Sequence, residues 1–332
     1  MMQPGGPGVS CLIDGRDWRS KLPSMLHFRP LVVGGLLLLA ACERSRDLPP
    51  TDSAAPGGPA PTGESPAPPA SGWDASAGPY LLIPGTSPSE AMVIDPEQRG
   101  VLAAGTPADS AALAGRAAIL LAPGGKRIAA RLTVPAPPAT DECAAPWPAM
   151  RLAADSAIGP WQVGFVEGNA EGVAADSLPS LPVADSSALV AAAARLASAL
   201  PVRDEAYFRG LPFAVRSLQR FSPAPGVQAF AASLVRRVSQ EDSPLEERTF
   251  IVAERESPQA PWRVAYQERA AGSEDEVETA ESIAPLILGA RHRPMLLVVH
   301  EVTDGLRYRL LERTGAARWV LRWTSATAKC GG

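Results

Sequence analysis

From Leu211 onward, the chain contains a long series of short segments in which apolar and polar residues alternate. A period of two is typical of β-strands, because successive side chains of a strand point to opposite faces. Asp304-Gly305 lies between two of these segments and provides a two-residue turn that suits antiparallel strands. The pattern predicts a meander of strands at about residues 211–221, 227–238, 247–256, 261–269, 284–290, 294–302, 306–313 and 317–325.

Shorter strands are expected before this meander. Tyr80–Ile83 and Ala91–Ile94 are apolar runs separated by turn residues. The turn Pro123-Gly124-Gly125 lies between two further apolar runs, 117–122 and 127–134, and this arrangement predicts a hairpin.

One helix is expected near residues 186–200. The segment is rich in Ala, Asp185 or Ser186 can cap its amino terminus, and Pro201 ends it. Packing against a sheet is indicated by apolar residues that fall near one face, namely Leu189, Val190, Leu196 and Leu200. We therefore expect a mainly β fold with antiparallel meander or sandwich-like sheets and one packed helix. An α+β arrangement is the alternative.

Three segments share a spacing in which Trp, an aliphatic residue and a second aromatic residue follow at every other position. In a strand these side chains would form a stripe on one face, and in two of the copies the preceding strand also matches. An exposed stripe would serve as a platform for a glycan or peptide, and a buried stripe would be core packing. Core packing is favoured, because three exposed stripes would form sticky apolar patches on the surface of a soluble domain. The candidate binding or core aromatics are Trp161, Trp262, Tyr266, Trp319 and Trp323.

An apolar run from Leu31 to Ala41 ends directly at Cys42. The run has the length of a signal-peptide hydrophobic region and is shorter than the ~20 residues of a membrane-spanning helix. Its last residues, Leu39-Ala40-Ala41-Cys42, resemble the lipobox of bacterial lipoproteins. The resemblance covers residues 25–42 and implies cleavage before Cys42 and acylation of that cysteine. An ordinary secretory signal is the alternative.

The same resemblance implies that residues 1–41 are a signal peptide, and Met25 is a better start than Met1. It also implies a membrane anchor of N-terminal acyl chains, because two or three chains hold a protein stably on a bilayer. Glu43 follows the cysteine. In bacterial lipoproteins a residue other than Asp at this position favours the outer membrane over the inner membrane.

The segment that follows, 42–72, is rich in Pro and Gly and contains no aromatic residue. Such a composition cannot bury enough apolar surface to fold, so a disordered tether is predicted. Beyond it we expect an N-terminal β subdomain at 73–140 and a helix plus β-meander domain at 141–332.

Cys143 and Cys330 are the cysteines that remain in the body when Cys11 lies upstream and Cys42 is lipidated. An exported chain passes through an oxidising compartment, so this pair predicts a disulfide bond. In the chain-entropy model, a disulfide bond that closes the loop from residue 143 to residue 330 stabilises the folded state by on the order of 5 kcal/mol. No metal site is expected, because CxxC and Cys-His spacings are absent.

No linear catalytic motif is present, since GxSxG, HExxH, SxxK and a GxGxxG that opens a helix are all absent. His300 with Glu301 and Asp304 can be drawn as a base with an orienting acid, but a surface strand end is favoured. Residues 273–281 hold five carboxylates without the spacing of a calcium loop, which predicts a solvated acidic loop. Arg236-Arg237 is interpreted as a charge pair at a strand edge.

A formal charge of −4 removes the electrostatic case for a nucleic-acid binder, which would need a basic face, so no nucleic-acid partner is expected. No cofactor and no catalytic residue is predicted. We expect a lipid-anchored cell-envelope protein with a non-catalytic binding or scaffolding role, whose partner is an unidentified envelope protein or glycan. The alternative is an envelope hydrolase whose site is assembled from scattered residues.

Overall fold

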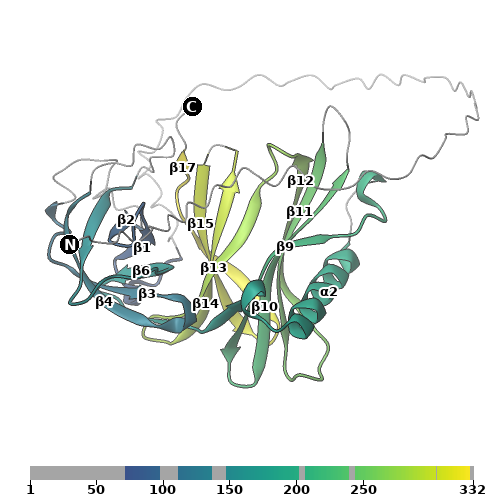
Figure 1. Cartoon of the computed structure of the whole chain (residues 1–332), viewed down its shortest axis with the longest axis horizontal. Coiled ribbons are helices and arrows are strands. Elements are labelled where there is room, and N and C mark those ends of the chain that lie inside the picture. The colour runs from purple at the N-terminus through teal and green to yellow at the C-terminus, as the bar shows by residue number, and fades with distance from the viewer. Residues whose placement is uncertain are drawn as a thin grey trace, which may run out of the picture. The chain divides into compact units, whose positions relative to one another are not determined.

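The structure is a computed structural model that describes residues 72–97, 111–136, 147–201, 206–238, 244–303 and 305–329 (Figure 1). The expected signal peptide, Cys42 and all but the last residue of the expected tether lie outside these ranges, as do Cys143 and Cys330. The described residues belong to one compact unit, residues 65–332.

The first described strands close into a barrel. They are β1 (Tyr80–Pro84), β2 (Glu90–Ile94), β3 (Ala117–Leu121), β4 (Arg127–Pro135), β5 (Ala149–Ala153) and β6 (Val163–Val166). Their spatial order is β1-β2-β5-β4-β3-β6, and β6 pairs with β1 to complete the ring. Apolar side chains such as Leu82, Leu120, Leu132 and Met150 fill the interior. Closure leaves no free strand edge.

The barrel confirms one expectation and corrects another. The turn Pro123-Gly124-Gly125 joins β3 to β4, so the predicted hairpin is confirmed. Gly124 has a φ of 77° in this turn, which glycine adopts without strain. The subdomain boundary expected at residue 140 lies inside the barrel, because β5 returns to pair with β2 and β4. The barrel therefore continues to Val166.

The rest of the described chain forms two antiparallel sheets. The first has the order β12-β11-β10-β9-β8 and consists of β8 (Ala175–Ser177), β9 (Ala214–Ala224), β10 (Val227–Val238), β11 (Leu245–Arg255) and β12 (Arg263–Ser273). The second has the order β16-β15-β14-β13-β7 and consists of β7 (Ala170–Gly172), β13 (Thr279–Leu288), β14 (Arg293–Val302), β15 (Gly305–Gly315) and β16 (Arg318–Thr324). A short strand, β17 (Ala328–Lys329), also pairs with β15. Each strand predicted by the alternation has a counterpart, and the mainly β fold class is confirmed.

The two sheets have the same topology. Each is a meander of consecutive strands, and the first strand of each meander also pairs with a short strand from the segment 170–177. The matching hairpins noted in the sequence are β11-β12 and β15-β16, which occupy the third and fourth places of their meanders. The repeated sequence pattern therefore marks equivalent positions in two similar sheets.

The sheets, the barrel and a helix are stacked in layers (Figure 1). The two sheets face each other through an apolar core that includes Val252 and Leu296. The helix α2 (Val183–Ala199) covers the other face of the first sheet, where Ile251 is buried. The barrel covers the other face of the second sheet and contributes Phe165 to that contact.

The helix begins earlier than its sequence signals predicted. Pro182 is the N-cap residue, and Asp185 lies in the first turn instead of at the cap. The side chain of Ser186 does not cap either, because its Oγ donates a hydrogen bond to the carbonyl of Val183 at 3.0 Å. The helix ends before Leu200, whose extended backbone leads into Pro201 as expected.

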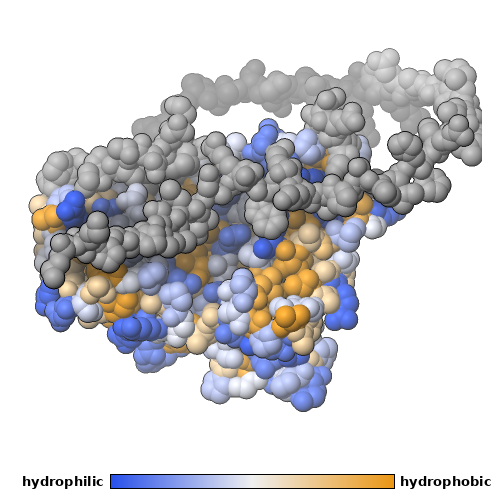
Figure 2. Space-filling view, in the orientation of Figure 1, coloured by the Kyte–Doolittle hydropathy of each residue, from blue (hydrophilic) through white to orange (hydrophobic). Residues whose placement is uncertain are grey.

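The face of α2 that meets the sheet is made mainly of alanines. Leu189, Ala192, Ala193 and Ala197 are buried, whereas the other leucines and the valine of the predicted face are half-buried. Small side chains let the helix approach the sheet closely. Figure 2 shows hydrophobic colouring over the region that α2 occupies in Figure 1, where Val183 is 81% exposed.

The aromatic segments do not form the one-sided stripes that their spacing predicted. In β16, Trp319 lies in the core between the sheets, whereas Trp323 packs toward the barrel. The register shifts between Leu310 and Leu311 of the neighbouring strand, so Arg322 is an extra residue that reverses the alternation. Trp319 is buried, and its Nε1 donates a hydrogen bond to Glu254 at 2.5 Å.

The other two segments are also divided between faces. Trp262 packs on the helix side of the first sheet, half-buried against Phe230, while Tyr266 lies on the side of the second sheet. Trp161 precedes β6 and joins the barrel interior, while Phe165 faces the second sheet. The structure thus places these aromatic residues in core clusters.

The beginning of the described chain is fixed to the second sheet. The ring of Trp73 lies 5.2 Å from that of Trp323 in an edge-to-face contact. Asp74 accepts a hydrogen bond from Arg293 of β14 at 2.5 Å. These contacts hold the chain in place before the first barrel strand begins at Tyr80.

Candidate functional site

A pocket of about 530 Å³ lies between the two sheets. Its size is that of a site for a small molecule. The first sheet contributes Arg216, Arg248 and Glu268 to its lining, and the second contributes Ala280, His300 and Arg309.

The pocket lies where the core between the sheets changes from apolar to charged. On β11, Phe250 belongs to the apolar core, and Arg248 and Glu246 continue the same face because alternate residues of a strand share a face. On β14, Val298 belongs to the core and His300 follows it on that face. The alternation of the strands therefore brings charged side chains from both sheets together.

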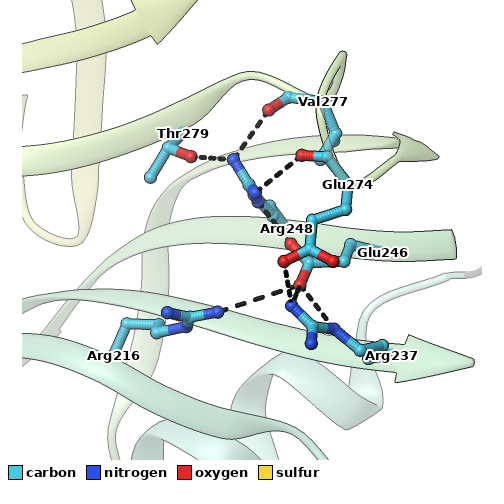
Figure 3. Close-up of polar contacts among 7 residues, drawn as sticks. All are labelled: Arg216, Arg237, Glu246, Arg248, Glu274, Val277 and Thr279. Carbon is cyan, nitrogen blue, oxygen red and sulfur yellow. Dashed lines mark hydrogen bonds and ion pairs between the residues drawn. The ribbon is translucent and has the colours of Figure 1, made fainter. Parts of the chain in front are cut away.

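Glu246 is a fully buried carboxylate surrounded by arginines (Figure 3). It accepts hydrogen bonds from Arg237 Nε at 2.8 Å and from Arg248 Nε at 2.7 Å. Burial disfavours the charged form, but these hydrogen bonds outweigh burial and hold the pKa of Glu246 below its ordinary value. Glu246 is therefore ionised at neutral pH.

The arginines around Glu246 differ in how fully they are held. Arg248 also donates to the carbonyls of Val277 at 2.8 Å and Glu274 at 3.0 Å, and contacts the hydroxyl of Thr279, so it ties β11 to the start of β13. Arg216 is different, because its Nη2 lies 3.8 Å from Glu246 and its side chain is 57% exposed. Among the described residues, no hydrogen bond holds the Arg216 guanidinium group.

His300 lies in a second charged group at the pocket. Only 2% of its surface is exposed, and its Nε2 lies 3.2 Å from a carboxylate oxygen of Glu268. Arg309 Nη1 donates to Glu268 at 2.7 Å, and Arg307 Nη2 donates to both oxygens of Glu278 at 2.6 and 2.7 Å. Burial, with the nearby charges of Arg309 and Arg307, lowers the pKa of His300 to about 4. His300 is therefore neutral at pH 7.

The carboxylates beside His300 are not the ones that the sequence indicated. Glu301 is exposed, and Asp304 lies outside the described residues. The structure instead brings in Glu268 from the other sheet and Glu278 from the turn before β13. Residues that meet across two sheets are far apart along the chain and form no short motif. Linear motifs could therefore not reveal this group.

The expectation that Arg236-Arg237 lies at a strand edge is wrong. Strand β10 is in the middle of the first sheet, and it pairs residue for residue with β11. Arg237 faces Glu246, and on the helix side Arg236 Nε donates to the fully buried Glu247 at 2.9 Å. Sequence reasoning missed these pairs. A signal for them was present, because Arg-Arg lies just before the turn of a hairpin and Glu-Glu just after that turn.

The acidic segment 273–281 runs from the last residue of β12 through the turn to the first residues of β13. It is not simply a solvated loop, because Glu274 pairs with Arg237 and Glu278 pairs with Arg307. Within the ranges that the structure describes, no three His, Cys, Asp or Glu side chains are grouped to hold a metal ion.

Among the described helices, none combines the length and apolar character needed to cross a membrane. Comparisons of the chain with family models, curated proteins and solved structures found no match.

Proposed function

We propose that this protein is a lipid-anchored component of the cell envelope that binds a ligand in the pocket between its two sheets without catalysis. The resemblance of Leu39–Cys42 to a lipobox supports the anchor, with acyl chains on Cys42. Glu43 after the cysteine favours the outer membrane over the inner membrane. The ligand is part of an envelope protein or glycan partner. At least one group of that partner is small enough to enter the pocket.

The observation that carries the binding role is that the potential catalytic groups at the pocket, His300, Glu268 and Glu278, are paired with neighbouring charged side chains. A hydrolase of the acyl-transfer type needs a nucleophile within hydrogen-bond reach of its base. The hydroxyl of Ser233 binds the carbonyl of Ala280, and that of Thr279 contacts Arg248, so neither is bound to His300. With a pKa of about 4, His300 is also a weak base at neutral pH. Fixed charges of this kind suit the orientation of a bound ligand.

Substituting Cys42 by Ser should abolish the incorporation of radiolabelled palmitate into the protein. Acylation requires the thiol of that cysteine, whereas Cys330 lies far from the lipobox in the sequence. Cys330→Ser is therefore the matched control and should label like the wild type. Labelling that persists in Cys42→Ser, or its absence from the wild type, would refute the anchor.

Filling the pocket should abolish the binding of a neutral apolar probe, phenylnaphthylamine, measured by its fluorescence. Ala280→Trp places a large side chain in the pocket from the second sheet, and Ala270→Trp does so from the first sheet. Ala188→Trp on the exposed face of α2 is the control and should bind the probe like the wild type. Circular dichroism checks that each variant is folded. The pocket is not a binding site if the wild type shows no saturable binding, or if both folded pocket variants retain it.

A further inference from the structure

We infer that the ligand of this pocket is an amphipathic organic anion, whose carboxylate or phosphate group is bound by Arg216 at the mouth of the pocket. This inference rests on the proposed binding function and names the chemistry of the ligand. Its basis is the balance of charge around the pocket, the position of Arg216 in its strand, and the rest of the pocket lining.

The charge around Glu246 is not balanced. Arg216, Arg237 and Arg248 surround Glu246, and Glu274 is the second carboxylate of the cluster (Figure 3). Three guanidinium groups therefore face two carboxylates. Arg237 and Arg248 are hydrogen-bonded to those carboxylates, so the excess positive charge resides on Arg216.

The group around His300 does not supply the missing negative charge. Arg307 and Arg309 are matched there by Glu268 and Glu278, and the low pKa of His300 keeps the imidazole neutral. This half of the pocket is balanced by itself. Within these two groups taken together, the unmatched positive charge is therefore that of Arg216.

Glu281 and Glu301 also border the pocket, from the strands of the second sheet. Ala280 and His300 are partners across β13 and β14, and their side chains are on the face toward the first sheet. The residues that follow them, Glu281 and Glu301, project from the opposite face because alternate residues of a strand do. Among the described residues, no ion pair joins either carboxylate to Arg216.

Arg216 owes its position to an irregularity in β9. Ser217 pairs with Ser233 and Val215 pairs with Leu234, so Arg216 is an extra residue with no partner on β10. A bulge of this kind turns a side chain away from the direction that the strand would give it, and bulges are frequent beside binding sites. Here the Arg216 side chain is 57% exposed, and among the described residues its guanidinium group has no hydrogen-bond partner.

The rest of the pocket lining suits the body of the ligand. Val235, Phe250 and Ala280 give the pocket an apolar portion, which favours a hydrocarbon or aromatic body. Arg309, on the opposite wall, has a buried Nε that makes no hydrogen bond to the described protein. A guanidinium group is well matched to carboxylate and phosphate oxygens, because it offers several donors in a planar arrangement.

The inference is tested with two probes of the same aromatic body, anilinonaphthalene sulfonate, which is anionic, and phenylnaphthylamine, which is neutral. Binding is measured by fluorescence at low ionic strength, where an exposed charge is least screened. Arg216→Gln should weaken the binding of the anionic probe about tenfold and leave that of the neutral probe unchanged. Arg195→Gln, which removes an exposed arginine from α2, is the matched control and should change neither affinity.

A displacement experiment distinguishes the kinds of anion. Octanoate, octyl phosphate or both should displace the anionic probe from the wild type more strongly than octanol does. Equal displacement by octanol would overturn the inference, as would an Arg216→Gln variant that binds the anionic probe like the wild type. If the neutral probe still binds in these cases, the pocket remains a binding site and the assignment of an anion is wrong. If neither probe binds the wild type, the proposed function itself is refuted.

Discussion

Replacing Glu247 by Gln should lower the free energy of unfolding by about 3 kcal/mol. The Glu247 carboxylate is fully buried, accepts hydrogen bonds from Arg236 and forms an ion pair with Arg269. A neutral amide would leave two guanidinium groups in a desolvated place without a compensating charge. Urea denaturation followed by circular dichroism measures the change.

Glu256→Gln is the matched control, because Glu256 is exposed and the described chain gives it no ion pair. It should change the free energy of unfolding by less than about 0.5 kcal/mol. A triple variant with Arg236→Met, Glu247→Leu and Arg269→Met should recover much of the lost stability, because well-packed apolar groups replace a buried ion cluster at little cost. If Glu247→Gln and Glu256→Gln have the same free energy of unfolding, this account of the cluster is wrong.

Replacing Trp323 by Ala should destabilise the protein by about 3–5 kcal/mol. Trp323 is 2% exposed, contacts Trp73 edge-to-face and donates a hydrogen bond from Nε1 to the carbonyl of Pro96 at 2.8 Å. Truncation would leave a cavity where the barrel meets the second sheet and would leave that carbonyl without its donor. Thermal and urea unfolding measure the effect.

Leu321→Ala in the same strand is the control for Trp323. Leu321 is 43% exposed, so its truncation should have less than half the effect of Trp323→Ala. If both variants lose the same stability, the contact between barrel and sheet does not depend on Trp323.

The strands could be predicted from the sequence, but the faces of their side chains could not. Alternation located β9 to β16, because a period of two persists over most of each strand. One extra residue, such as Arg322 in β16 or Arg216 in β9, reverses the faces after it. Nothing in the local composition marks these bulges, so the predicted aromatic stripes were wrong and Arg216 was overlooked.

The site was predictable to the extent that it is local. Arg236-Arg237 and Glu246-Glu247 face each other across one hairpin, and their order along the chain is enough to pair them. The approach of His300 to Glu268 depends on the stacking of two sheets, which a single sequence does not specify. The expectations for Cys42, Cys143 and Cys330 concern residues outside the described ranges and stay predictions.

The attachment of Trp73 and Asp74 to the second sheet has a mechanical consequence. Tension applied to the chain before residue 72 is transmitted through these contacts to Arg293 in β14 and Trp323 in β16. The strands of the barrel come later in the chain, so they are shielded from that load. A pulling force on the amino-terminal side of the folded body therefore acts on the second sheet and does not separate the barrel strands.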